Sequence, residues 1–488
     1  MNDKSQDTAF LGHPKGLSTL FFTEMWERFS YYGMRAILLY YMYYSVTQGG
    51  LGIDKTTAAS IMSIYGSLVY LSSTLGGFIS DRILGSRRTV FWGGVLIMIG
   101  HIILATPFGK AALFLSILFI VLGTGMLKPN VSEMVGGLYE EGDQRRDSGF
   151  TIFVFGINVG SLLAPLIVGF LGQQVNFHLG FSLAAVGMFF GLLQYTIQGK
   201  DLPKDSLYPT DPIEPDQIKK YSLRVTMAVV VLAVILGIMA VLGSLNINNI
   251  INLVTILAIL IPVYYFALML HSKKTTKVER SRLKAYVALF IASILFWSIE
   301  EQGSVVLALF ANDQTKLSIF GLPFPASLFQ SFNPLFILLY TPFFAWLWTK
   351  MGSKQPSSPA KFAYGLFFAG ASFVWMMLPG MLYGTGVKVS PLWLIVSWAL
   401  VIVGEMLISP IGLSVTTKLA PKAFKAQMMS IWFIADAVAQ AINAQIVKFY
   451  SQGTEVAYYG WIGAITIGFG LIVLLMVPAI KRLMDGVE

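Results

Sequence analysis

The first long apolar segment of the chain carries four charged side chains and a phenol that could share one helix face. If the segment is helical, successive residues turn by about 100°, so these side chains fall within an arc of roughly 100°. They are Glu24, Glu27, Arg28, Tyr31 and Arg35. Glu24 and Arg28 stand four positions apart, where an ion pair can form directly. Such a face could hold and pass on a proton, or bind a charged ligand.

Further charged side chains lie inside other apolar segments: Lys128, Glu300, Glu301, Glu405 and Asp436. A charge at the centre of a bilayer costs at least about 2.5 to 3.5 kcal/mol, so we expect these residues to be functional. Two structural alternatives stay open. The first-helix charges could merely hold helices together, and Lys128, which ends an apolar run, could reach back to the membrane surface. Adjacent Glu300 and Glu301 point about 100° apart, so we expect at most one to face a cavity.

The signs of these charges are unevenly distributed along the chain. Excess positive charge lies in the N-terminal half, and acids lie in the C-terminal half. This distribution of charge suits a zwitterionic ligand whose carboxylate faces Arg28 and Lys128 and whose amine faces Glu405. Protonating an acid that is paired with a base breaks a pair worth about 3 to 5 kcal/mol and frees the base to bind a carboxylate. The same residues could therefore couple binding to a proton.

The sequence gives no sign of enzyme chemistry. It contains neither His-Glu-x-x-His nor Gly-x-Ser-x-Gly, and it has no cysteine and no clustered metal ligands. We therefore expect neither an enzyme nor a metal or organic cofactor.

The segments that hold the charged residues are long enough to cross a bilayer. Only 12% of the 488 residues are charged, against about 25% in soluble proteins. Stretches such as 90–109, 362–387 and 456–480 contain no Asp, Glu, Lys or Arg. β-Barrel strands would read as short alternating segments, so the sequence predicts an all-α polytopic membrane protein.

Apolar blocks separated by charged or Gly/Pro/Asn-rich turns predict fourteen spans. The uncharged stretches 148–199 and 225–272 are each too long for one crossing, and each is expected to be a hairpin that turns at 172–176 or at 243–249. The expected spans are 17–44, 57–80, 89–106, 111–130, 148–171, 179–198, 225–243, 250–270, 284–311, 327–349, 361–382, 391–416, 427–448 and 457–480.

The loops between these spans predict the orientation of the chain. Most of the 34 Lys and Arg residues fall in loops on the side of the two termini, whereas the other side holds only Lys55, Lys110, Lys316, Lys388 and Lys448. Basic loops stay in the cytoplasm, so both termini are expected there, in a multi-pass protein of the cytoplasmic membrane. The net charge of +9 is then an orientation signal, and nucleic acid is not an expected partner.

Without the spans 225–243 and 250–270, six spans remain on each side. This six-plus-six plan resembles that of the major facilitator superfamily, in which substrate binds between the halves near mid-membrane. We expect an N-terminal six-helix bundle at 1–198, cytoplasmic linkers and an inserted two-helix hairpin at 199–283, and a C-terminal six-helix bundle at 284–488. The interior of the hairpin has almost no polar side chains, which predicts a peripheral, lipid-facing position.

Three motifs carry a more specific resemblance. Residues 24–33, EMWERFSYYG, resemble the ExxERFxYYG signature of the proton-dependent oligopeptide transporter (POT) family. Residues 77–87, GFISDRILGSR, resemble the loop motif of the superfamily, and residues 150–160, FTIFVFGINVG, resemble a second signature of the family. The resemblance implies a monomeric symporter that imports di- and tripeptides with protons by alternating access, driven by the proton gradient without a cofactor.

The resemblance also implies a role for each matching residue. Proton coupling would use Glu24, Glu27, Arg28 and Glu301. The outer gate would consist of Arg35, Glu300 and Glu301.

For the peptide itself, Arg28 and Lys128 would meet the carboxylate. Its amino terminus would be held by Asn158, Asn333 and Glu405. The pocket for peptide side chains would be lined by Tyr31, Tyr32, Tyr70, Trp297, Trp432 and Phe433. Asp436, one turn after Trp432, is expected to join that pocket and to favour cationic side chains.

Two other functions stay open at this point. The superfamily scaffold also supports proton-coupled transport of drugs or nitrate, and a non-transporting peptide receptor would share the same sequence features. The charged face of the first helix and Glu405 favour a zwitterion over a plain anion or a lipophilic cation. Animal members of the family carry a histidine in the second span where Ser63 stands here, so proton handling must rest on the glutamates.

Overall fold

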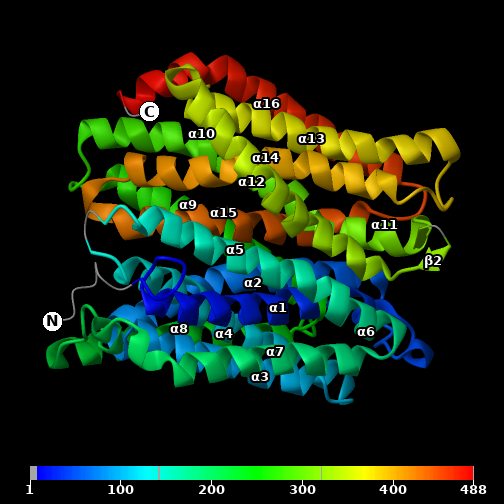
Figure 1. Ribbon diagram of the computed structural model, residues 1–488, viewed down its shortest axis with the longest axis horizontal. Helices are drawn as coiled ribbons and strands as arrows, with labels where there is room; N and C mark the ends of the chain where they lie inside the picture. Colours follow the sequence, from blue (N-terminus) through cyan, green and yellow to red (C-terminus); the bar gives the residue numbers. More distant parts are fainter. Residues whose placement is uncertain (1–7, 141–142, 320, 487–488) are drawn as a thin grey trace.

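The computed structural model describes residues 8–140, 143–319 and 321–486, and they are almost wholly helical. Fourteen long helical segments run along the long axis of the molecule, where α5 with α6 and α10 with α11 each count as one segment (Figure 1). Thirteen of the fourteen are long and apolar enough to cross a membrane. The remaining segment is α1 (Lys15–Tyr43), which carries the charged face. One antiparallel pair of short strands, β1 (Ser318–Ile319) and β2 (Leu322–Pro323), follows α11. The predicted all-α polytopic membrane protein is confirmed.

The helices form two layers (Figure 1). The first layer contains α1, α2 (Lys55–Ile79), α3 (Ser86–Leu104), α4 (Gly109–Gly137), α5 (Arg146–Ala164), α6 (Phe170–Gln174) and α7 (Phe177–Ile197). The second contains α10 (Lys277–Glu300), α11 (Val306–Gln314), α12 (Phe332–Met351), α13 (Ser358–Tyr383), α14 (Leu392–Leu419), α15 (Lys425–Ile446) and α16 (Glu455–Met484). The start of α1 and the end of α16 lie at one end of the molecule, which we call the terminal end.

Both predicted hairpins are present, and asparagine caps explain where their second helices begin. The turn after α6 leads to α7, where the side chain of Asn176 accepts hydrogen bonds from the backbone of His178 and Leu179. The inserted helices are α8 (Pro215–Val241) and α9 (Ile247–His271), and Asn246 caps the second of them through the backbone N–H of Asn249. A side-chain oxygen at this position satisfies an N–H group that has no partner within the helix.

The inserted hairpin differs in part from its expected position. None of the side chains of α8 is buried, in agreement with a lipid-facing helix. Helix α9, however, packs against α15: Thr255 Oγ1 donates to the carbonyl of Ala441 at 3.2 Å and accepts from Gln445 Nε2 at 3.0 Å. The expected peripheral, lipid-facing position therefore leaves out one feature of α9: a single face of this apolar helix, which carries Thr255 and Ala258, is buried.

The linker before α8 is tied to the π-helical turn Ser80–Leu84, which continues α2. Arg82 in this turn forms an ion pair with Asp211, donates to Gln217 at 2.8 Å and donates to the Tyr221 hydroxyl at 3.2 Å. The backbone N–H of Asp211 also donates to the carbonyl of Asp81 at 2.9 Å. The insert thus contacts the first layer through its linker and the second layer through α9.

The two layers meet firmly at the end opposite the termini. The Tyr40 hydroxyl of α1 donates to the carbonyl of Ala308, and the Tyr44 hydroxyl donates to Asn312 at 2.6 Å. Lys55, the first residue of α2, pairs with Asp313 at 2.7 Å. The molecule is therefore closed between its layers at this end.

Candidate functional site

The charged face of α1 forms a buried ion network. Arg28 Nε lies 2.8 Å from a carboxylate oxygen of Glu24 and 2.8 Å from one of Glu27. All three side chains are at most 4% exposed, and Glu24 Oε2, both oxygens of Glu27 and Arg28 Nη2 have no hydrogen-bond partner within the described structure. A network with unsatisfied oxygens and one shared cation has free acceptors that can take a proton.

Two helical turns further along, the same face reaches the second layer. Arg35 Nη2 forms an ion pair with Glu301 and donates to the hydroxyl of Ser304 at 2.9 Å. Tyr31 lies between the two arginines, with Arg28 Cζ 5.7 Å and Arg35 Cζ 6.0 Å from its ring centroid. The first helix therefore connects the buried network to a charged contact between the layers.

A cavity of about 590 Å³ lies between the layers next to this contact. Volumes of roughly 300 to 1,000 Å³ are typical of small-molecule sites. Its walls extend along α12 to Trp348 and along α14 to Leu413, toward the terminal end of the molecule. The layers are joined at the opposite end, so the cavity is closed there.

The expected site residues divide into two groups around this cavity. Tyr32, Arg35, Tyr70, Asn158, Trp297, Glu300, Glu301, Asn333 and Glu405 line it. Glu24, Glu27, Arg28, Tyr31, Lys128, Trp432, Phe433 and Asp436 do not. The structure thus brings residues of the first, second, fifth, seventh, eighth and tenth core spans to one cavity, and it leaves the ion network of α1 directly behind the wall.

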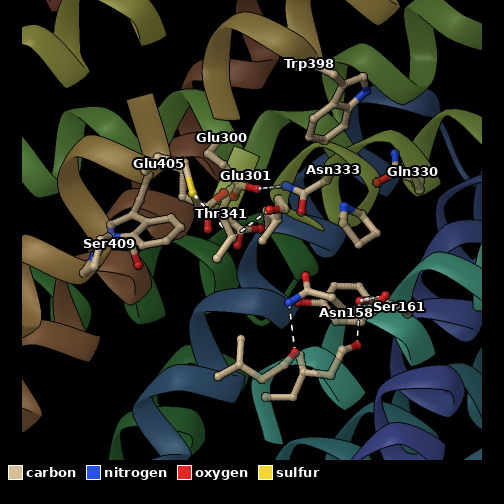
Figure 2. A pocket seen from close by; sticks show the side chains of 18 of the residues that line it. Asn158, Ser161, Glu300, Glu301, Gln330, Asn333, Thr341, Trp398, Glu405 and Ser409 are labelled. Carbon is tan, nitrogen blue, oxygen red and sulfur yellow. Dashed lines mark hydrogen bonds between the residues drawn. The ribbon is translucent and has the colours of Figure 1, made fainter. Parts of the chain in front are cut away.

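The polar groups of the C-terminal half lie along one wall of the cavity, and Asn158 and Ser161 face them from the other wall (Figure 2). Asn333 Nδ2 donates to Glu300 Oε1 at 2.6 Å. Glu405 Oε2 is buried and has no hydrogen-bond partner among the described residues. This wall therefore offers two carboxylates and an amide to a ligand, and one carboxylate oxygen is free to accept.

Glu300 and Glu301 both line the cavity, which corrects the expectation that at most one of them would. Helix α10 ends at Glu300, and a 3₁₀ turn, Glu301–Ser304, follows. The end of the helix lies between α1 and α12, so Glu301 reaches Arg35 while Glu300 reaches Asn333.

Lys128 lies within α4 and not at a helix end. The helix continues through Pro129 to Gly137, and the side chain of Asn130 donates to the carbonyls of Met126 and Gly76. Proline is tolerated inside membrane helices, and Pro129 does not end α4. The Lys128 ammonium lies over the ring of Tyr70, 4.1 Å from its centroid. Its position is therefore one side chain away from the cavity that Tyr70 lines.

The remaining aromatic candidates are placed by packing. Tyr31 is 3% exposed between the arginines, and Trp432 is 4% exposed against Gly412 of α14. Phe433 is exposed but does not line the cavity. Cavity residues that sequence reasoning missed include Ser161, Gln330, Thr341, Trp398 and Ser409. The sequence holds little signal for them, because each stands singly in an otherwise apolar or turn context.

No group of three or more His, Asp or Glu side chains that could hold a metal ion occurs within residues 8–140, 143–319 and 321–486. The charged groups of the site instead form pairs and short networks, as Arg28 and Arg35 do with their glutamates.

Comparison with known proteins gives a consistent result. Residues 87–462 match the model of the POT family. The chain is 53% identical over 480 residues to the "Uncharacterized transporter YclF" of Bacillus subtilis (strain 168), with 98% of this chain and 96% of the relative covered. It is 49% identical over 497 residues to a "Di-/tripeptide transporter" of Lactococcus lactis subsp. lactis (strain IL1403), with both chains fully covered.

A solved structure shows the same architecture. The crystal structure of a peptide transporter POT in complex with sulfate is 54% identical in sequence, covers all of both chains and superposes with a TM-score of 0.95. The major facilitator fold with six plus six core helices and two inserted helices is therefore confirmed. The chain is a transporter of the POT family.

Proposed function

We propose that this protein is a proton-coupled symporter that imports di- and tripeptides across the cytoplasmic membrane by alternating access. The observation that carries the proposal is the continuity between the buried Glu24–Arg28–Glu27 network and the Arg35–Glu301 pair at the cavity wall. Proton-accepting carboxylates and a ligand cavity thus share one helix. The names of the similar proteins supply the substrate class, di- and tripeptides.

In this proposal the terminal end faces the cytoplasm, because basic loops gather there. The described conformation is then open to the cytoplasm and closed at the outer end. The bundles at 1–198 and 284–488 rock about the cavity, and the segment 199–283 adds the inserted hairpin with its linkers. The protein acts as a monomer and needs no cofactor, because the proton gradient drives accumulation.

The cavity walls suit the two ends of a peptide. The amine meets Glu405 together with Asn158 and Asn333, and Glu405 Oε2 is free to accept from it. The carboxylate meets Lys128 and Arg28 on the opposite side, once Tyr70 gives access to them. Peptides of any sequence share these two ends, so charges fixed at two poles allow broad specificity.

Uptake of labelled dialanine into liposomes that contain the purified protein tests the proposal. A pH gradient, acidic outside, should drive accumulation that Glu24→Gln, Arg28→Ala and Glu405→Ala abolish. Gly237→Ala in α8 is a matched control, because nothing lies within 4 Å of the added methyl group. The proposal is contradicted if dialanine uptake is the same with and without the pH gradient, or if the three charge variants take up dialanine as fast as the wild type. Binding of dialanine without transport would favour a receptor, and transport of nitrate or a drug alone would favour the other transporter class.

A further inference from the structure

A lysine of the second half lies behind the cavity wall, toward the terminal end of the molecule. The ammonium of Lys361, on α13, lies over the ring of Trp348 on α12, 4.1 Å from its centroid, and Trp348 lines the cavity. Gln355, between the two helices, accepts a hydrogen bond from this ammonium at 2.8 Å and donates one to the carbonyl of Trp348 at 2.9 Å. The arrangement repeats that of Lys128 and Tyr70 in the first half, where a lysine also lies over an aromatic ring of the cavity wall.

The surroundings of Lys361 are unfavourable for a cation. Its side chain is 6% exposed, and no ion pair joins it to a carboxylate within the described part of the chain. It also stands in the first turn of α13, where the helix dipole is positive. A buried cation without an acid is costly, and the ammonium has three donors, of which Gln355 takes one. The position therefore suits an anionic ligand group.

The distance from Glu405 to this lysine matches the length of a tripeptide. Thr341 of α12 and Met406 of α14, the neighbour of Glu405, lie at one level, with 3.9 Å between the Thr341 hydroxyl and the Met406 sulfur. Trp348 follows Thr341 by seven residues of the same helix, which is about 10 Å at a rise of roughly 1.5 Å per residue. An extended peptide covers about 3.5 Å per residue, so three residues span about 10 Å and two only about 7 Å. Glu405 and Ser409, one turn further along α14, both line this path (Figure 2).

We infer that Lys361 and Trp348 form a second carboxylate site, which binds the carboxyl terminus of tripeptides. The inference rests on the proposed function, in which the peptide amine meets Glu405. A dipeptide reaches across the cavity to Lys128, whereas a tripeptide extends along the cavity toward Lys361. Rotation of the Trp348 side chain brings the ammonium to the cavity, where the carboxylate takes up its free donors. One amine site and two lysines thus serve peptides of two lengths.

Equilibrium binding of trialanine and dialanine to the purified full-length protein tests the inference. Lys361→Gln removes the cation but keeps a side chain that can bond Gln355. We expect the Kd of trialanine to rise about tenfold, equivalent to about 1.4 kcal/mol. The Kd of dialanine should change less than twofold, and so should that of trialanine amide, which lacks the carboxylate. Lys128→Gln should weaken dialanine at least about fivefold more than trialanine.

Two further variants separate the charge of Lys361 from its packing. Lys361→Arg keeps a cation and should retain most of the trialanine affinity that Lys361→Gln loses. Lys350→Gln is a matched control, because Lys350 also lies over a tryptophan of α12, Trp346, at 4.8 Å, but Trp346 does not line the cavity. The affinities of Lys350→Gln for both peptides should equal those of the wild type.

Several results would overturn the inference. One is an unchanged Kd of trialanine in both Lys361→Gln and Lys361→Met, each monodisperse. Another is an equal loss for trialanine and dialanine, or for trialanine and its amide, because a lysine that only supports the end of α12 gives this result. A third is an equal loss of both peptides in Lys128→Gln, which lies in the other half and tests the inference even if the Lys361 variants do not fold. Failure of the proposed function looks different, because the wild-type protein itself would then bind neither peptide.

Discussion

Removal of the negative charge of Glu301 should open the molecule at the end opposite the termini. Glu301 and Arg35 are each 8% exposed, and without the carboxylate the guanidinium keeps the Ser304 hydroxyl and the ring of Tyr31 as described partners, neither of which carries a negative charge. Loss of one partner of a buried ion pair costs about 3 to 5 kcal/mol. The cost disappears when the halves separate here and water reaches Arg35. At about 1.4 kcal/mol per factor of ten, Glu301→Gln should shift the equilibrium toward the outer-open state by roughly 10² to 4 × 10³.

The ion pair between Lys55 and Asp313 provides a matched control at the same end. Its side chains are 51% and 35% exposed, so water screens the attraction. Exposed pairs contribute at most about 1 kcal/mol, and Asp313→Asn should therefore shift the same equilibrium by less than about sixfold.

Distances between pairs of spin labels measure this equilibrium directly. The chain has no cysteine, so introduced cysteines are the only labelling sites. One pair, at Thr47 and Lys316, reports on the end opposite the termini, and a second, at Lys200 and Lys354, reports on the terminal end; all four residues are exposed. Glu301→Gln should lengthen the first distance and shorten the second. Distributions equal to those of the wild type, or an equal shift in Asp313→Asn, would refute the reasoning.

Three further predictions concern other parts of the molecule. Glu405→Gln should weaken dialanine binding at least about tenfold, because a hydrogen bond to a charged group contributes about 1.5 to 3 kcal/mol, and it should leave N-acetyl-dialanine unaffected in a competition assay. Arg82→Ala removes the side chain that holds the linker before α8, so amide hydrogen exchange should rise across 209–221 while helix α9 stays protected. Burial and the nearby guanidinium of Arg145 lower the pKa of His13, whose ring bonds the Tyr139 hydroxyl at 2.9 Å. Because the pKa of His13 is lower in the folded state, neutral His13 stabilises the fold fully above the unfolded-state pKa of about 6.5, and this stabilisation is lost as the pH falls through the folded-state pKa. Acidification should therefore raise amide hydrogen exchange across residues 8–14 in the wild type but not in His13→Gln.

The charged face of α1 could be predicted from the sequence because helical periodicity alone fixes its geometry. The spacing of Glu24, Arg28 and Arg35 required only that the segment be helical, and the ion pair between Glu24 and Arg28 follows from their four-residue separation. The hairpin turns were equally accessible, because Asn176 and Asn246 are caps that act on the next few residues. Local rules determine all of these features.

Features that depend on contacts between helices could not be read in this way. The lining role of both Glu300 and Glu301 depends on the position of their helix end between α1 and α12. The apolar helix α9 gives no sequence sign that Thr255 meets α15. Trp398 packs on Gly303, where a side chain would collide with the indole, and only the fold brings these residues together. The family motifs pointed to several site residues, but whether a side chain lines the cavity depends on how the two halves pack.

The most direct test of proton-coupled transport is proton movement driven by a peptide gradient alone. Liposomes with the purified protein, a pH-sensitive dye inside, equal pH on both sides and a clamped membrane potential would receive external dialanine. The lumen should acidify as the peptide enters, and Glu24→Gln should abolish the acidification. Entry of dialanine without any change in luminal pH would contradict a coupling of the α1 carboxylates to peptide transport.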